Sequence, residues 1–204
     1  MEQLDNLKNI WKNQGESRIK FSEGDIFEMV HKKSSSIVKW ILIISIIEFI
    51  LPNMILFFTD FESTQRLYEN YGLKNIMKIY TIIHVIVILG FIYCFYKNYK
   101  NISAENSVRK LLKSILNTRK TVKYYIYYNI VMAAIIGIHM FYKIFNSPLF
   151  INKLPENTNM VVIWLIALGL FALILFLFWG FYRIIYGILL KKLNHNYKEL
   201  RNNQ

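Results

Sequence analysis

Four long runs of apolar residues dominate this sequence and limit the folds that it can adopt. They cover about residues 40–58, 76–96, 124–145 and 160–182, and each is close to the ~20 residues that a helix needs to cross a ~30 Å hydrocarbon layer. Hydrophobic residues make up 54% of the 204-residue chain, which is more than a soluble domain of this size buries in one core. The sequence therefore predicts an all-α integral membrane protein with four transmembrane helices packed as a bundle.

The distribution of basic residues predicts how the spans are oriented. Twenty of the 25 Lys and Arg residues lie before the first span, between the second and third, or after the fourth. Because Lys and Arg collect on the cytoplasmic side of membrane proteins, we expect a multi-pass protein of the inner membrane with both termini in the cytoplasm. An aromatic belt is expected at the same interface. Its members are Trp40, Tyr93, Tyr96, Tyr99, Tyr124, Tyr125, Tyr127, Tyr128, Trp179, Tyr182 and Tyr186.

The formal net charge of +12 does not indicate a nucleic-acid-binding protein. Most basic residues flank the spans, where each contributes about 1 kcal/mol of attraction to anionic lipid, so the lipid bilayer is the expected partner. The sequence contains no Gly-rich phosphate loop, no HExxH motif and no nucleophile elbow. The single cysteine, Cys94, excludes a disulfide within the chain and a cysteine-based zinc site. We therefore expect no enzyme, no catalytic residue, no cofactor and no metal.

The chain divides into a cytoplasmic N-terminal helical segment, residues 1–36, and a transmembrane bundle with cytoplasmic extensions, residues 37–204. Ser22 and Asp25 form a variant of the capping box that starts many helices. Apolar residues then recur at helical spacing. One continuous helix is therefore expected from about Glu23 through the first span.

The other basic connections are also expected to be helical. Residues 108–116 carry an apolar stripe, which fits either a helix lying on the inner leaflet or a third span prolonged into the cytoplasm. The second interpretation is favoured because no Gly or Pro separates Ser103 from Tyr124. The C-terminal tail continues the fourth span in the same way, through Leu193.

A weak internal repeat appears when the chain is shifted by 84 residues. Residues 38–40 then fall on residues 122–124, and residues 75–76 fall on residues 159–160. Two spans per unit would make a parallel repeat of two hairpins. Because the identities are so few, chance matching of membrane-boundary residues explains them as well as a duplication does.

The N-terminal segment carries one amphipathic face, formed by Leu4, Leu7, Ile10 and Trp11. This face is the candidate binding surface for a cytoplasmic protein partner. The alternatives are that it lies on the inner leaflet or packs against helices of the same chain.

Glu48 is the most unusual single residue, because it lies some eight residues inside the first span. A charge at that depth costs about 3 kcal/mol on insertion scales, so Glu48 is expected to face the bundle interior. Pro52 follows four residues later and is expected to kink the helix, since its missing N–H frees the carbonyl of Glu48. Ser45 lies one turn earlier on the same face.

Two histidines lie at depths that could bring them near Glu48. His84 and His139 are about 8 and 6 residues inside the ends of the second and third spans that face away from the basic connections, which corresponds to about 12 and 9 Å. The expected polar cluster is therefore Glu48, Ser45, His84 and His139. Three interpretations stay open: a structural cluster in which Glu48 accepts from a histidine, a proton relay or sensor, and a bis-histidine haem site.

Two stretches resemble uncharacterised four-span inner-membrane proteins of flavobacteria and other Bacteroidota. These are residues 4–12, LDNLKNIWK, and residues 26–40, IFEMVHKKSSSIVKW. Some members of that group are encoded beside sigma factors of the extracytoplasmic-function type, so the resemblance implies a membrane-tethered regulator in a sigma-factor pathway. The chain departs from the zinc-binding anti-sigma pattern, because it lacks His-x-x-x-Cys-x-x-Cys.

The leading hypothesis from the sequence is a non-enzymatic inner-membrane anchor or regulator that binds a cytoplasmic protein through its N-terminal helices. The alternative is a small transporter, channel or proton-linked sensor that uses the buried Glu/His cluster. A four-span chain can also form a homo-oligomer to complete a pathway.

Overall fold

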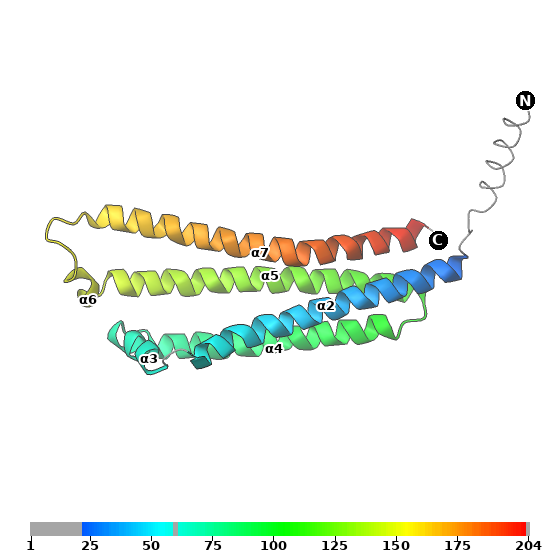
Figure 1. Ribbon diagram of the computed structural model, residues 1–204, viewed down its shortest axis with the longest axis horizontal. Helices are drawn as coiled ribbons and strands as arrows, with labels where there is room; N and C mark the ends of the chain where they lie inside the picture. Colours follow the sequence, from blue (N-terminus) through cyan, green and yellow to red (C-terminus); the bar gives the residue numbers. More distant parts are fainter. Residues whose placement is uncertain (1–21, 59–60, 203–204) are drawn as a thin grey trace, which may run out of the picture.

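The computed structural model describes residues 22–58 and 61–202, and within these ranges every regular element is helical (Figure 1). Four of the helices, α2, α4, α5 and α7, are long and apolar enough to cross a membrane. The prediction of an all-α membrane protein with four transmembrane helices is therefore confirmed. The helices are α2 (Glu23–Phe58), α3 (Phe61–Asn70), α4 (Lys74–Ser103), α5 (Val108–Phe145), α6 (Pro148–Ile151) and α7 (Met160–Asn202).

The four long helices form a ring in which each packs against two neighbours. Helix α2 contacts α4, α4 contacts α5, α5 contacts α7, and α7 returns to α2. Both described ends of the chain, residues 22 and 202, lie at the same end of the ring, together with the short connection 104–107. We call this the basic end, and the opposite end, which carries α3 and α6, the loop end.

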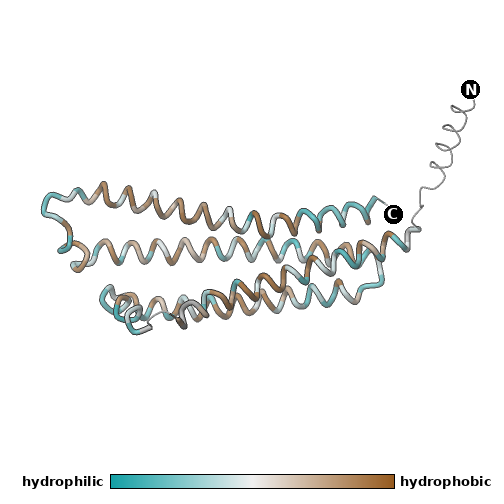
Figure 2. Tube along the Cα trace, in the orientation of Figure 1, coloured by the Kyte–Doolittle hydropathy of each residue, from teal (hydrophilic) through white to brown (hydrophobic). Residues whose placement is uncertain are grey.

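The long helices exceed the thickness of a bilayer. Helices α2, α4, α5 and α7 contain 36, 30, 38 and 43 residues, or about 54, 45, 57 and 64 Å at 1.5 Å per residue, against a hydrocarbon layer of ~30 Å. The predicted prolongations of the first, third and fourth spans are confirmed. Figure 2 shows that polar residues gather towards the two ends of the bundle.

Helix α2 begins at the predicted capping box. The carboxylate Oδ2 of Asp25 accepts from the backbone N–H of Ser22 at 2.9 Å, and Ser22 Oγ accepts from the N–H of Asp25 at 3.2 Å. The helix then runs without a break through residue 36 and through Pro52 to Phe58. Residues 23–36 therefore belong to the same helix as the first span.

The best-packed part of the core lies towards the basic end. Val30, Ile102, Leu111 and Leu193, one from each long helix, are fully buried. A polar contact crosses the same region, where Asn196 Nδ2 donates to Ser34 Oγ at 3.0 Å and both side chains are buried. These residues lie outside the four apolar runs of the sequence, and this part of the bundle is packed like a soluble four-helix bundle.

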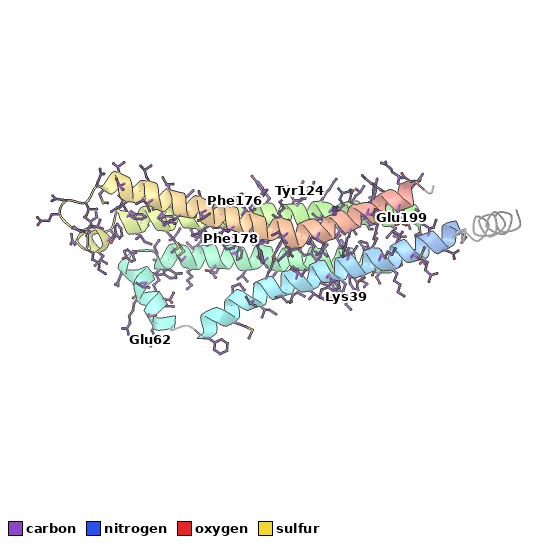
Figure 3. All side chains as sticks on the ribbon, turned by 45° about the horizontal axis from the view of Figure 1, so that its top comes forward. Lys39, Glu62, Tyr124, Phe176, Phe178 and Glu199 are labelled. Carbon is purple, nitrogen blue, oxygen red and sulfur yellow. The ribbon has the colours of Figure 1, made fainter. Side chains whose placement is uncertain are left out.

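The bundle opens towards the loop end. Figure 3 shows α2 diverging from α5 and α7 as it approaches the segment around Glu62. Helices α5 and α7 stay in close contact there, because Gly137 has no side chain and the ring of Phe171 packs directly against its backbone. A Cβ at position 137 would lie 2.2 Å from that ring. The divergence of α2 leaves space beside Glu48, which a cavity occupies.

Candidate functional site

Glu48 of α2 binds two tyrosine hydroxyls inside the bundle. Tyr125 of α5 donates to Glu48 Oε2 at 2.6 Å, and Tyr186 of α7 donates to the same oxygen at 3.0 Å. The other carboxyl oxygen, Oε1, is buried and has no hydrogen-bond partner among the described residues. Buried polar atoms are nearly always hydrogen-bonded, so Glu48 is only half satisfied by its own protein.

A cluster of aromatic rings holds the two hydroxyls in place. The ring of Tyr125 meets those of Phe91 and Phe95 edge-on, each at a centroid distance of 5.5 Å, and that of Tyr186 at 5.7 Å. Tyr182 stacks on Tyr186 at 6.0 Å. Edge-on and offset arrangements are the ones that aromatic pairs prefer. The phenol groups are therefore positioned by packing, independently of their bonds to Glu48.

A cavity of about 460 Å³ begins beside Glu48 and extends towards α3. Its walls are mostly apolar and aromatic, with a few polar side chains among them. The described lining contains no Lys and no Arg, and Glu48 is its only acidic residue. The polar side chains of the lining are Glu48, Asn53, Tyr68, Tyr80, Thr81, His84, Tyr125, Asn129 and Tyr182.

The two asparagines of the lining are anchored to the helix backbone. Asn129 Nδ2 donates to the carbonyl oxygen of Tyr125 at 2.9 Å, and Asn53 Nδ2 donates to that of Phe49 at 2.6 Å. Each of these bonds uses the amide nitrogen. The amide oxygen and the second N–H then remain available to a ligand.

The structure brings together only part of the expected polar cluster. His84 lines the same cavity as Glu48, and its ring stacks on that of Tyr128 at a centroid distance of 5.8 Å. His84 Nδ1 lies 3.5 Å from the Tyr128 hydroxyl, a long contact for a hydrogen bond. His84 and Glu48 therefore line the same cavity without a hydrogen bond between them.

The other two members lie elsewhere. Ser45 is fully buried and donates to the carbonyl oxygen of Leu42 in its own helix at 2.8 Å. A backbone carbonyl three or four residues earlier is a common hydrogen-bond acceptor for a serine inside a helix. His139 does not line the Glu48 cavity but packs edge-on against Tyr80 at 6.0 Å and lines a different hollow.

Two interpretations of the cluster need correction. Among the described residues Glu48 accepts from tyrosines, not from a histidine as the structural interpretation expected. His84 and His139 line different hollows, and this placement does not fit a bis-histidine haem site. No group of three or more His, Cys, Asp or Glu side chains within the described ranges could hold a metal ion.

Tyr125 and Tyr186 are the site residues that the sequence interpretation missed, because it assigned both to the interfacial belt. Their neighbour Tyr124 is 66% exposed, whereas Tyr125 is 2% exposed. A signal for this was present in the spacing of α5. In the half of α5 nearer the basic end, helical steps of three and four connect the buried residues Leu111, Ile115, Thr118, Val122 and Tyr125.

A third hollow lies between α2 and α7 at the basic end. Its volume is about 950 Å³, and lysines of both helices line it. The lining residues are Lys32, Lys33, Ser36, Ile37, Ile188, Lys191, Lys192, His195 and Asn196. Four lysines make this groove strongly basic, and it lies on the part of the bundle that extends beyond the apolar spans.

The expected partner-binding face, Leu4, Leu7, Ile10 and Trp11, lies outside the described residues. Residues 24–204 match the model of a family described as a domain of unknown function, DUF8845. No curated protein and no solved structure matches the chain. The matched range contains all of the four long helices except Glu23, and every lining residue of the Glu48 cavity and of the basic groove.

Proposed function

The chain belongs to the DUF8845 family, and we propose that it is a non-enzymatic membrane protein that binds a small solute beside Glu48 and acts as a transporter, channel or proton-linked sensor. One observation carries this proposal: a carboxyl group, one oxygen of which has no hydrogen-bond partner in the described part of the chain, lines a cavity inside the bundle. Ionisable residues in transmembrane segments typically mark pathways for substrates, ions or protons.

The energetics favour a functional role for Glu48. A carboxylate in the middle of a membrane helix costs about 3 kcal/mol on insertion scales. Two hydrogen bonds between membrane helices return about 1.2 kcal/mol on average and about 3.4 kcal/mol at most. At their strongest, the bonds from Tyr125 and Tyr186 therefore only offset the cost of inserting Glu48. An apolar residue at position 48 would give a bundle of equal stability.

The proposal places the protein in the inner membrane with the basic end in the cytoplasm. The basic residues at this end of the bundle support that orientation. The cavity extends from Glu48 towards α3, so it would face the external side. Solutes and protons would then reach Glu48 from outside the cell.

Infrared spectroscopy of the purified protein tests the proposal. If the Glu48 carboxyl exchanges protons through the cavity, a carboxyl-to-carboxylate band change should appear on titration with pH and should be absent from Glu48→Gln. The matched control is Glu28→Gln, an exposed glutamate of the same helix, which should keep the band of Glu48. A wild-type spectrum with no band that Glu48→Gln removes would mean that Glu48 is sealed and structural, and would overturn the proposal. Glu48→Asp provides a second carboxyl variant if Glu48→Gln does not fold.

A second candidate function is a regulator that binds a cytoplasmic partner, and the length of the helices favours it. Helix α7 contains 43 residues, about 64 Å, against a hydrocarbon layer of ~30 Å, so a packed helical platform extends beyond the bilayer. The N-terminal face containing Leu7 and Trp11 precedes this platform in the chain.

Copurification tests the second candidate. The tagged protein would be isolated from native membranes in a mild detergent, and its partners identified by mass spectrometry. A near-stoichiometric cytoplasmic protein that is lost from the Leu7→Ala/Trp11→Ala variant would support the regulator. If every copurifying protein remains with that variant, the N-terminal face does not bind them.

A further inference from the structure

The chemistry of the Glu48 cavity restricts the solute that it can hold. Its described lining provides one carboxyl group and no basic side chain, so an anionic solute would meet an unfavourable charge. A bare divalent metal ion prefers several oxygen ligands, and no cluster of acidic or histidine side chains converges among the described residues. A single positive charge is the ligand charge that matches the site.

Aromatic rings surround the cavity on several sides. They come from α3, α4, α5 and α7 as well as from α2 itself. The faces of such rings attract cations, by about 0.5–1 kcal/mol at exposed sites and about 2 kcal/mol where water is excluded. The aromatic lining residues are Phe49, Tyr68, Tyr80, Tyr125, Phe178 and Tyr182.

We propose that the cavity binds an organic monocation, an amine or quaternary ammonium with an apolar substituent, whose charged nitrogen lies beside the Glu48 carboxylate among the rings of Tyr125 and Tyr182. This inference rests on the proposed function and names the solute class of the same site. The apolar substituent would occupy the wall formed by Ile88, Ile130 and Ile136. The cavity volume of about 460 Å³ falls within the ~300–1,000 Å³ range of small-molecule sites.

Binding of such a cation depends on pH in a defined direction. The titratable groups that line the cavity or contact Glu48 are His84 and Tyr80 of α4, Tyr125 of α5, Tyr182 and Tyr186 of α7, and Tyr68 of α3. Acid protonates Glu48 and removes the attraction for the cation, and a proton on His84 adds repulsion. Affinity therefore falls as the pH decreases, and the proton and the cation compete for Glu48.

Equilibrium dialysis of the purified full chain with radiolabelled benzyltrimethylammonium tests the inference. Saturable binding is expected at neutral pH, weaker by about tenfold or more in acid and in Glu48→Gln, a factor equivalent to ~1.4 kcal/mol. Glu28→Gln should bind like the wild type. Phenylacetate, an anion of similar size, should not compete.

Three results would overturn the inference: equal binding to Glu48→Gln, equal competition by phenylacetate, or no saturable binding to a wild-type protein that is folded by circular dichroism. The infrared titration distinguishes failure of the solute class from failure of the proposed function. If the Glu48 band titrates but benzyltrimethylammonium does not bind, the solute class is wrong and the proposed function stands. If the band does not titrate either, both fail.

Discussion

Removing single tyrosine hydroxyls measures how strongly Glu48 is held in the bundle. Tyr125→Phe deletes the shorter of its two hydrogen bonds, 2.6 Å against 3.0 Å for Tyr186. The aromatic packing stays, because the ring of Phe is the same size. The free energy of unfolding should therefore report the bond and not the core.

The magnitude follows from two limits. A hydrogen bond to a charged group contributes about 1.5–3 kcal/mol in soluble proteins, whereas bonds between membrane helices average about 0.6 kcal/mol and reach about 1.7 kcal/mol. The membrane values apply more closely, because Glu48 also finds partners before the helices associate. Tyr125→Phe, which removes the shorter bond, should cost about 0.6–1.7 kcal/mol and Tyr186→Phe about half of that. The double variant should cost more than the sum, because Oε2 then loses its last described donor.

Reversible unfolding in mixed micelles, followed by circular dichroism, provides the measurement. Tyr182→Phe is the matched control, since Tyr182 packs in the same cluster and its hydroxyl has no recorded hydrogen bond among the described residues. In a Glu48→Ala background, Tyr125→Phe should lose its effect. Equal destabilisation by Tyr125→Phe and Tyr182→Phe would refute the assigned hydrogen bond.

Three further predictions concern packing and orientation. Gly137→Ala should destabilise the bundle by about 1–3 kcal/mol through overpacking against Phe171. The control Gly169→Ala, whose Cβ meets nothing within 4 Å, should be neutral or gain up to about 1 kcal/mol of helix propensity. The same unfolding assay compares the two variants, and equal effects would contradict the close approach of α5 and α7. Ser34→Ala should cost about 1–3 kcal/mol, because it leaves the buried amide of Asn196 unpaired, and adding Asn196→Leu should recover most of the loss; thermal unfolding tests whether the double variant is the more stable of the two. Green fluorescent protein fused to the C-terminus should fluoresce and alkaline phosphatase inserted into the α3–α4 connection should be active, and the opposite pattern would reverse the proposed orientation.

Sequence patterns along the chain were sufficient to predict the helices. A membrane helix satisfies its backbone hydrogen bonds within its own segment, so its length and apolar character can be read without knowing its neighbours. The capping box at Ser22 and Asp25 is equally local, and both of its bonds form. The helix α3, Phe61–Asn70, was not predicted, because a short polar helix with paired charges has no apolar run to mark it.

The direction in which each residue faces was harder to predict, because each step along a helix turns the side chain by about 100°. Depth along the spans placed Glu48, His84 and His139 within reach of one another. Rotation then placed His84 in the Glu48 cavity and His139 in another hollow. The belt assignment of Tyr125 failed for the same reason, since depth distinguishes it little from the exposed Tyr124.

Local patterns in the sequence were enough to establish the four apolar spans, the helical continuation of three of them beyond the membrane thickness, and the carboxyl group at a costly depth in the first. Which residues meet that carboxyl group depends on the packing of the helices. Tyr125 and Tyr186 are separated from Glu48 by 77 and 138 positions in the chain, and they reach it because the helices pack as a ring. The cavity beside Glu48 has the same origin, since it depends on where α2 diverges from α5 and α7, and no local pattern encodes the distance between helices.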